Sequence, residues 1–518
     1  MKLAVGLLAL FASTALAAEK PNIVVILCDD LGYGDVKANN PECKIATPHM
    51  DRIAREGVRF TDAHTPSSVC SPTRYGLLTG RYNWRSKLQS SVLGGLSPRL
   101  IEPGRETIAS LLKAQGYHTA AVGKWHLGMD WVKLPGRTVS ELSIETPEQV
   151  HNVDYTQPIA NGPNSVGFDR YFGIAASLDM VPYTFIADNR VAAAPTVDKT
   201  FPMHPGFPGQ CRLGPAAPDF EVENVLPTLA RKAVEYIGER AATKQPFFLY
   251  LPLNAPHTPI APTAEWRGKS GLNLYADFVM ETDWAVGEVL AALDRAGVAS
   301  NTLLVFTSDN GCSPQARIED LQAKGHAVSG PLRGHKADVF DGGHRVPFFV
   351  RWPAKVKPAV SDQLICLTDI FATCAEVVGM RVPAKAGEDS FSFLPNLTGQ
   401  GKSARDAVVH HTITGAFAIR QGPWKLALCP GSGGWSAPRD PEAVKQGLPD
   451  TQLYRIADGD IAEQKNVAAQ NPEVVARLTK LLEKFVADGR TTPGPRAQNA
   501  VAVVLRKPLP AATPRKRK

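Results

Sequence analysis

Two short acidic motifs stand at the ends of apolar stretches rich in β-branched residues. Asp29 and Asp30 follow "NIVVILC", and Asp309 and Asn310 follow "NTLLVFTS". Their side chains offer only oxygen ligands, which Ca²⁺ and Mg²⁺ prefer and zinc does not. Either motif alone is typical of a turn or a helix cap. Because both follow predicted strands, we predict a metal site for a hard cation.

Basic side chains recur at similar positions along the chain. The set comprises Arg74, Lys124, His126, His257 and Lys336. A lone Lys or His is usually solvated or satisfied in the core, but four of these five follow a predicted strand or a helix start. A divalent cation beside Arg and Lys suits an oxyanion of concentrated negative charge. The combination predicts a site for a sulfate or phosphate ester.

Cys70 stands in "SVCSPTRYGLLTG", residues 68–80. Pro72 predicts the first turn of a helix, whose free N–H groups favour an anion at Cys70. A thiolate nucleophile is one interpretation. A phosphatase-type thiolate would need a longer phosphate-cradling loop before its Arg, and soft sulfur is a poor ligand for a hard cation. These surroundings predict that Cys70 is not a thiol in the working protein.

The other seven cysteines are scattered and form no CxxC pair. This spacing argues against a zinc site. A disulfide such as Cys366–Cys374 is an open alternative if the protein is exported.

Strand-like and helical patterns alternate over the first 400 residues. Strands are expected within 21–36, 107–128, 246–259, 301–311 and 346–353, and helices within 47–60, 107–128 and 278–297. This alternation predicts an α/β fold with a mostly parallel central sheet flanked by helices. Such sheets build their sites at the carboxyl ends of the strands, where the acidic and basic residues fall.

The remaining organisation is read from changes in pattern. Residues 130–225 are expected to form a long, loop-rich insertion. After about residue 400, short strands "AVVHHTI", "AFAIRQ" and "WKLALC" and a late helix predict a smaller antiparallel sheet with a helix. The expected division is a signal peptide (1–18), a catalytic domain (19–400), a C-terminal α+β subdomain (401–490) and a basic tail (491–518).

The N-terminus has the pattern of an export signal. Lys2 precedes the apolar run Leu3 to Phe11, and Ala15-Leu16-Ala17 is typical of a cleavage site. We expect an exported protein, periplasmic or secreted, without a membrane span. Part of the net charge of +7 lies in the terminal "PRKRK", which is typical of a solvated end. No nucleic-acid partner is expected.

The motif "CSPTRYGLLTGR" closely resembles the signature of the type I, formylglycine-dependent sulfatases of the alkaline phosphatase superfamily. The resemblance extends over residues 21–490 and includes "ILCDDLGYGDV", "GKWHLG", "GFDRYFGI", "PFFLYLPLNAPHTP", "TSDNG" and "LRGHKADVFDGGHRVPFFVRWP". In that family the Cys is oxidised to Cα-formylglycine by a maturation enzyme. The resemblance implies the same for Cys70 and makes that enzyme a partner.

The resemblance also implies a role for each residue of the site. Ca²⁺ would be held by Asp29, Asp30, Asp309, Asn310 and the modified Cys70. Arg74 would stabilise the formylglycine hydrate, and Lys124 and Lys336 would contact sulfate oxygens. Lys336 with His257 would protonate or neutralise the leaving alkoxide, and His126 would deprotonate the remaining hydroxyl.

The implied substrate is a sulfated carbohydrate. The surrounding motifs resemble those of bacterial carbohydrate sulfatases, N-acetylgalactosamine-6-sulfatases among them, and favour a sulfated galactose or N-acetylgalactosamine. Asp179 and His344 are candidates for binding sugar hydroxyls, with a structural acid and a packed histidine as the alternatives. Trp435, in a Gly-rich loop, could stack on a sugar face.

Two other functions stay open on the sequence. One is a phosphoester or phosphonate hydrolase of the same superfamily, although those enzymes more often carry extra metal ligands in place of the Lys and His set. The other is a non-catalytic protein that binds sulfated glycans. The complete set of basic residues and metal ligands argues against it.

Overall fold

The computed structural model describes residues 20–456 and 459–508, so the expected signal peptide and the terminal "PRKRK" lie outside it. A ten-stranded sheet dominates the described chain, in the order β13-β2-β12-β11-β1-β10-β4-β5-β6-β7. Its five central strands are parallel and comprise β1 (Asn22–Cys28), β4 (His118–Lys124), β5 (Arg170–Ile174), β10 (Phe247–Pro252) and β11 (Thr302–Ser308). The predicted α/β class with a mostly parallel sheet is confirmed.

The flanking strands of the sheet are shorter. Antiparallel pairs join β11 to β12, β12 to β2, β5 to β6 and β6 to β7. The outer strands are β2 (Val58–Phe60), β6 (Ile186–Ala187), β7 (Arg190–Val191), β12 (Phe348–Arg351) and β13 (Ala359–Ser361). Two small separate sheets pair β3 (Ala63–His64) with β14 (Ile365–Cys366), and β8 (Val197–Lys199) with β9 (Gly214–Ala216).

The region 130–225 is less purely loop than expected, because it supplies β5, β6 and β7 to the main sheet. The strand β5 reads "RYFGI", in which Tyr, Phe and Ile favour a strand but the segment is short and contains a glycine. Its pairing with β4 brings Gly173 so close to Gly123 that a Cβ at 173 would lie 1.7 Å from the Gly123 carbonyl oxygen. The close approach to β4 therefore requires the glycine at position 173.

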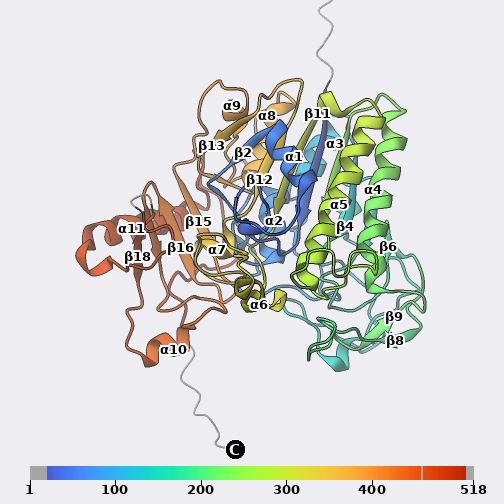
Figure 1. Ribbon diagram of the computed structural model, residues 1–518, viewed down its shortest axis with the longest axis horizontal. Coiled ribbons are helices and arrows are strands. Elements are labelled where there is room, and N and C mark those ends of the chain that lie inside the picture. The colour runs from blue at the N-terminus through green and yellow to red at the C-terminus, as the bar shows by residue number, and fades with distance from the viewer. Residues whose placement is uncertain (1–19, 457–458, 509–518) are drawn as a thin grey trace, which may run out of the picture.

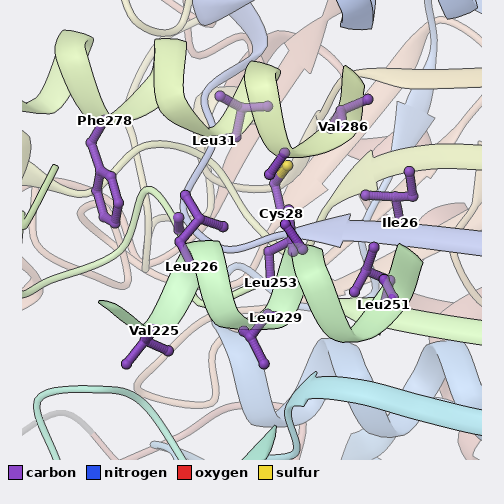
Figure 2. Packing of buried hydrophobic residues seen from close by; sticks show 14 of the residues in the cluster. Ile26, Cys28, Leu31, Val225, Leu226, Leu229, Leu251, Leu253, Phe278 and Val286 are labelled. Carbon is purple, nitrogen blue, oxygen red and sulfur yellow. The ribbon is translucent and has the colours of Figure 1, made fainter. Parts of the chain in front are cut away.

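Helices cover both faces of the sheet. Alternate residues of β1 point to opposite sides, with Val24 and Ile26 in one core cluster and Ile23 and Val25 in the other. The first face packs against α1 (Pro48–Glu56), α4 (Val225–Ala241) and α5 (Leu274–Arg295), and Figure 2 shows Leu226 and Leu229 of α4 against this side. The second face packs against α2 (Cys70–Thr79), α3 (Ile108–Ala114) and α8 (Asp369–Val377).

The C-terminal part forms its own antiparallel sheet beside the main one, as Figure 1 shows in orange and red. Its strands are β15 (Ala407–His411), β16 (Phe417–Gln421), β17 (Trp424–Ala427) and β18 (Gln452–Arg455), with helices α10 (Asp440–Lys445) and α11 (Pro472–Asp488). The sequence predicted the first three strands and α11. It missed β18, which is four residues long. Short helices α6 (Ile318–Ala323), α7 (Asp341–His344) and α9 (Leu394–Leu397) complete the described elements.

Part of the expected tail is attached to the folded chain. The Gln498 carbonyl accepts a hydrogen bond from Arg81, and Asn499 accepts one from Arg85. Val503 and Leu505 pack against the core of the C-terminal sheet. Over the described residues, no helix combines the length and apolarity that a membrane span requires.

All eight cysteines are buried and free. The possible Cys366–Cys374 disulfide is therefore wrong. Cys366 lies on β14 in the core of the C-terminal sheet, whereas Cys374 on α8 lies in the core under the main sheet. The two thiols point into different cores because strand and helix turn them apart.

Candidate active site

The two acidic motifs meet at the carboxyl edge of the sheet. Strands β1 and β11 are parallel neighbours with Cys28 opposite Ser308, so the residues that follow them lie side by side. The Asp30 backbone N–H lies 3.3 Å from Asp309 Oδ1, and Asn310 Nδ2 donates to Asp30 Oδ1 at 2.7 Å. Asp30 has a positive φ of 66°, which turns the chain at the end of the strand.

Basic side chains from three other segments reach these carboxylates. Arg74, from the first turns of α2, donates to Asp309 Oδ2 from Nη2 at 2.7 Å and from Nε at 3.0 Å. Lys124, at the end of β4, donates to Asp29 Oδ2 at 2.6 Å. Lys336, in the segment before α7, lies 2.6 Å from Asp30 Oδ1. The structure thus brings together residues that are up to 306 positions apart in the chain.

Burial and neighbouring charges shift the pKa values of this cluster in opposite directions. Burial alone would raise the pKa of Asp29, but Lys124, His257 and Arg74 outweigh it and lower that pKa. Burial and the neighbouring Asp29 raise the pKa of Asp309. Burial opposes the charge on Lys336, yet Asp30 above all raises its pKa, so it stays protonated. The ion pair with Arg74 does not fully offset these two effects at Asp309.

The donor set fits a hard cation. Asp29 Oδ1 and Asn310 Oδ1 are buried and have no hydrogen-bond partner among the described residues. Together with Asp30 and Asp309 they present oxygen atoms only, from two adjacent strand ends. A divalent cation there would satisfy the unpaired oxygens and offset the repulsion that raises the pKa of Asp309.

Cys70 is the first residue of α2 and is 2% exposed. It lines a cavity of about 230 Å³ together with His257, Lys336, Asp179 and Trp435. Burial raises the pKa of its thiol, although Lys124 and Lys336 act in the opposite direction. A reactive thiolate is therefore disfavoured at this position.

The two histidines of the site, His126 and His257, each leave one ring nitrogen unprotonated, and it is a different atom in each. His126 Nε2 lies 2.8 Å from the Leu93 carbonyl, so Nε2 carries the proton and the buried Nδ1 is an acceptor without a partner among the described residues. Burial, helped by Lys124 and Arg74, lowers the pKa of His126 and keeps it neutral. His257 Nδ1 faces the Thr258 carbonyl at 2.7 Å, which leaves Nε2 as its acceptor, 3.7 Å from Asp30.

The two sugar-binding candidates lie in different environments. Asp179 lines the cavity, and its Oδ2 is held by Arg212 at 2.7 Å while Oδ1 has no partner among the described residues. His344 is fully buried and does not line the cavity. Its ring stacks on the ring of His410, with 3.6 Å between the two centroids. Its Nδ1 lies 3.0 Å from Nδ1 of His64. The geometry favours the packed-histidine alternative for His344.

His344 belongs to what we call the histidine cluster, which comprises His64, His344, His410, Asp62, Asp341, Lys425 and Glu463. Nitrogen atoms of the three histidines lie within 4.8 Å of one another, as in a metal site. The rings of His344 and His410 are nearly parallel, however, with 13° between their planes. Imidazole lone pairs lie in the ring plane, so two stacked rings cannot direct them at one ion. Stacking therefore excludes a shared metal in this arrangement.

Several cavity residues were not found from the sequence. Arg212 and Met203 come from the insertion, Gln315 follows β11, and Ile413 comes from the C-terminal sheet. None stands in a motif whose spacing indicates chemistry. Trp435, which the Gly-rich loop did bring to notice, lines the cavity from the C-terminal side.

Fold and site together define an enzyme that acts on an anionic ester at the carboxyl edge of a parallel α/β sheet. A family model described as Sulfatase matches residues 21–380. Over 507 residues the chain is 33% identical to an N-acetylgalactosamine-6-O-sulfatase of Bacteroides thetaiotaomicron, covering 90% of this chain and 93% of that protein. It is 30% identical to arylsulfatase A of Homo sapiens, covering 94% and 92%. The chain belongs to the sulfatase family, whose members hydrolyse sulfate esters.

Solved structures agree with this assignment. One from work on the metabolism of multiple glycosaminoglycans by Bacteroides thetaiotaomicron has a TM-score of 0.78 at 33% identity, covering 90% of this chain and 99% of that one. Another, Ps i-CgsB in complex with k-i-k-neocarrahexaose, has a TM-score of 0.67 at 25% identity, covering 92% and 95%. Sulfatases of this family generally use a formylglycine and Ca²⁺.

Proposed function

We propose that this sulfatase removes a sulfate ester from a sulfated carbohydrate of the galactose or N-acetylgalactosamine type. One observation carries the proposal. Cys70 lies at a cavity beside Lys336 and His257, and its sulfur is within 4.8 Å of carboxylate oxygens of Asp29 and Asp309. Together with Asp30 and Asn310, these two aspartates offer oxygen atoms only as candidate metal ligands. The cavity continues to Asp179 and Trp435, polar and aromatic groups suited to a sugar.

The cofactors are proposed from the donor chemistry. Asp29, Asp30, Asp309 and Asn310 would hold Ca²⁺, with the modified Cys70 as a further ligand. Ca²⁺ and the formylglycine would supply, when present, a Lewis acid for the sulfuryl oxygens and a hydrated aldehyde whose two hydroxyls serve attack and release. The chain's own residues provide the remaining steps.

Each basic residue has a distinct task in this proposal. Arg74 holds Asp309 and would stabilise negative charge on the modified Cys70. Lys124 and Lys336 would bind sulfate oxygens, and Lys336, whose pKa is raised, would keep a proton to give to the leaving alkoxide. His126, neutral and with an unprotonated Nδ1, would accept a proton from the modified Cys70. His257 would assist Lys336 at the leaving group, because it lines the same cavity.

The sugar end is supported by the relatives and by two cavity residues. An N-acetylgalactosamine-6-O-sulfatase is among the similar proteins. Asp179 Oδ1 is free to accept a hydrogen bond from a sugar hydroxyl, since Arg212 holds only Oδ2. Trp435 offers an aromatic face. Export to the periplasm or outside the cell, and maturation of Cys70 by a formylglycine-generating enzyme, complete the proposal.

A substrate screen tests this function. Defined sulfated mono- and disaccharides are incubated with the mature enzyme, beside matched phosphate esters, and mass spectrometry of the peptide around residue 70 establishes that the thiol has become an aldehyde. We expect sulfate release from a galactose- or N-acetylgalactosamine-type sugar. Faster phosphate turnover would support the phosphoester hydrolase instead, and binding of a sulfated sugar without turnover would support the glycan-binding alternative.

A further inference from the structure

The C-terminal part of the chain reaches the cavity through Ile413 and Trp435. Trp435 belongs to the Trp435 loop, residues 431–438, which lies over the Lys336 segment, residues 335–340. The Val339 N–H donates to the Ser432 carbonyl at 2.7 Å. A Cβ at Gly434 would lie 2.4 Å from the Ala337 carbonyl oxygen, so the two backbones are in direct contact. The sulfate end and the sugar end of the cavity thus meet at one junction.

The carboxylate of Asp338 lies inside this junction and is fully buried. Its Oδ1 accepts hydrogen bonds from the backbone N–H groups of Trp435 at 2.8 Å and Ser436 at 3.0 Å. Its Oδ2 accepts one from the His335 N–H at 2.9 Å and one from the Ser436 hydroxyl. Backbone donors have fixed directions, so a carboxylate that accepts from both segments fixes their relative position.

We propose that Asp338 is a positioning residue that couples Lys336 to Trp435 and so determines how the enzyme holds the sugar attached to the sulfate. The inference rests on the proposed carbohydrate substrate. Lys336 is anchored at the acidic motif through its 2.6 Å contact with Asp30. Trp435 is anchored to the catalytic side by Asp338 and by the close approach at Gly434.

Asp440, the first residue of α10, provides a matched control that contacts the same loop. Its Oδ1 accepts hydrogen bonds from the N–H groups of Gly431 at 3.1 Å and Gly433 at 3.0 Å. These bonds tie the base of the Trp435 loop to α10 within the C-terminal part. Asp338 and Asp440 therefore each accept two backbone hydrogen bonds from one loop, but only Asp338 also accepts one from the Lys336 segment.

The first test is a double-mutant cycle on the full-length, formylglycine-containing enzyme, with a sulfated sugar that the wild type hydrolyses. We expect Asp338→Ala and Trp435→Ala each to raise KM roughly tenfold, with kcat changed less than about threefold, and the double variant to be no worse than the worse single one. Asp338→Asn should recover most of the loss, because its amide oxygen can still accept from Trp435 and Ser436. Asp440→Ala should change KM less than about twofold. Additive effects, or an equal effect of Asp440→Ala, would overturn the coupling.

The second test does not depend on the substrate. Hydrogen exchange is measured on peptides that cover the Lys336 segment and the Trp435 loop. Asp338→Ala should speed exchange in both, whereas Asp440→Ala should speed it in the loop alone; unchanged exchange of the Lys336 segment in Asp338→Ala would overturn the proposal. If wild-type enzyme releases sulfate from no sugar, the proposed function fails while this measurement still decides the coupling. Should Asp338→Ala not fold, Gly434→Ala, which forces the two backbones apart, replaces it in both tests, and Asp338→Asn remains the conservative variant.

Discussion

Two buried clusters of this protein contain the same kinds of residue and do different work. The active-site cluster comprises Asp29, Asp30, Cys70, Arg74, Lys124, His126, His257, Asp309, Asn310 and Lys336. This cluster and the histidine cluster each combine aspartates, histidines and lysine at almost no exposure. The first borders the cavity through Cys70, His257 and Lys336, and none of the residues of the second lines it. In the second, Lys425 lies 2.7 Å from Asp341 and from Glu463, and His344 and His410 stack. Residue types alone do not distinguish a reactive cluster from a structural one. Contact with the cavity and the orientation of the histidine rings distinguish them here.

The histidine cluster is linked to the active site by the segment before α2, which runs from His64 of the cluster to Cys70. In this segment the Thr65 N–H donates to the His344 carbonyl at 2.7 Å. The Ser67 hydroxyl donates to the His411 carbonyl at 2.7 Å. The first contact joins the segment to α7, and the second joins it to β15 of the C-terminal sheet. The cluster therefore holds the chain in place where the reactive residue must sit.

The variant Cys70→Ser should have the largest effect, and that effect should be on turnover rather than on stability. A serine has one hydroxyl and cannot form a hydrated aldehyde, so we expect turnover to fall by roughly a thousandfold or more. Thermal unfolding should change little, because the two side chains are close in size. Substantial residual sulfate release in this variant would contradict a formylglycine nucleophile.

The converse change is Lys425→Met in the histidine cluster. It leaves the Asp341 and Glu463 carboxylates buried without their cation, which should cost about 3–5 kcal/mol of unfolding free energy. Urea denaturation measures this loss, and kcat of the remaining folded enzyme should stay within about threefold of the wild-type value. Lys480→Met, at an exposed position of α11, is the control. A loss no greater than that of the control would make the cluster dispensable for stability.

Metal removal should affect only the active-site cluster. A chelator such as EDTA is expected to lower activity at least roughly tenfold, and Ca²⁺ should restore it and raise the melting temperature, because binding to the native state stabilises it by about 2.7 kcal/mol at a hundredfold excess over Kd. Zinc should give no stabilisation that depends on His410, since the stacked rings cannot share an ion. Activity indifferent to chelation would refute the Ca²⁺ assignment, and a zinc shift lost in His410→Phe would refute the stacking argument.

The most gradual effect is a pH dependence of stability. Burial, as the main cause, lowers the pKa values of His64, His344 and His410, so these imidazoles stay neutral in the folded state. Unfolded histidines take up protons below about pH 6.5, so stability is complete above that pH and falls as the pH drops, by up to about 1.4 kcal/mol per pH unit for each histidine. Urea midpoints from about pH 7.5 to about pH 5 measure the slope. His410→Phe should make it shallower by one proton; an unchanged slope would mean that His410 is charged in the folded state.

Much of the framework could be predicted from the sequence because its signals are local. The apolar stretch of β1 and the acids that follow it indicate a buried strand with polar groups at its end. Pro72 marks the start of α2 at Cys70. Strand β5 escaped prediction because five residues that include a glycine give too short a pattern to stand out within the loop-rich region. His344 was open between two interpretations, because nothing in "FDGGHR" indicates that its ring faces His64, 280 residues away.

By itself the sequence determined the chemistry available: the oxygen-only acidic motifs, the basic set, the Cys70 motif and the α/β alternation of elements. These follow from side-chain type and from periodicity over a few residues. Only the tertiary structure decided which polar groups share a site and which are sealed away. It placed Trp435 against Asp338 across 97 residues and stacked His344 on His410 outside the cavity. Such placements depend on how distant segments pack. The packing energy arises only when these segments come into contact, so no single segment encodes it.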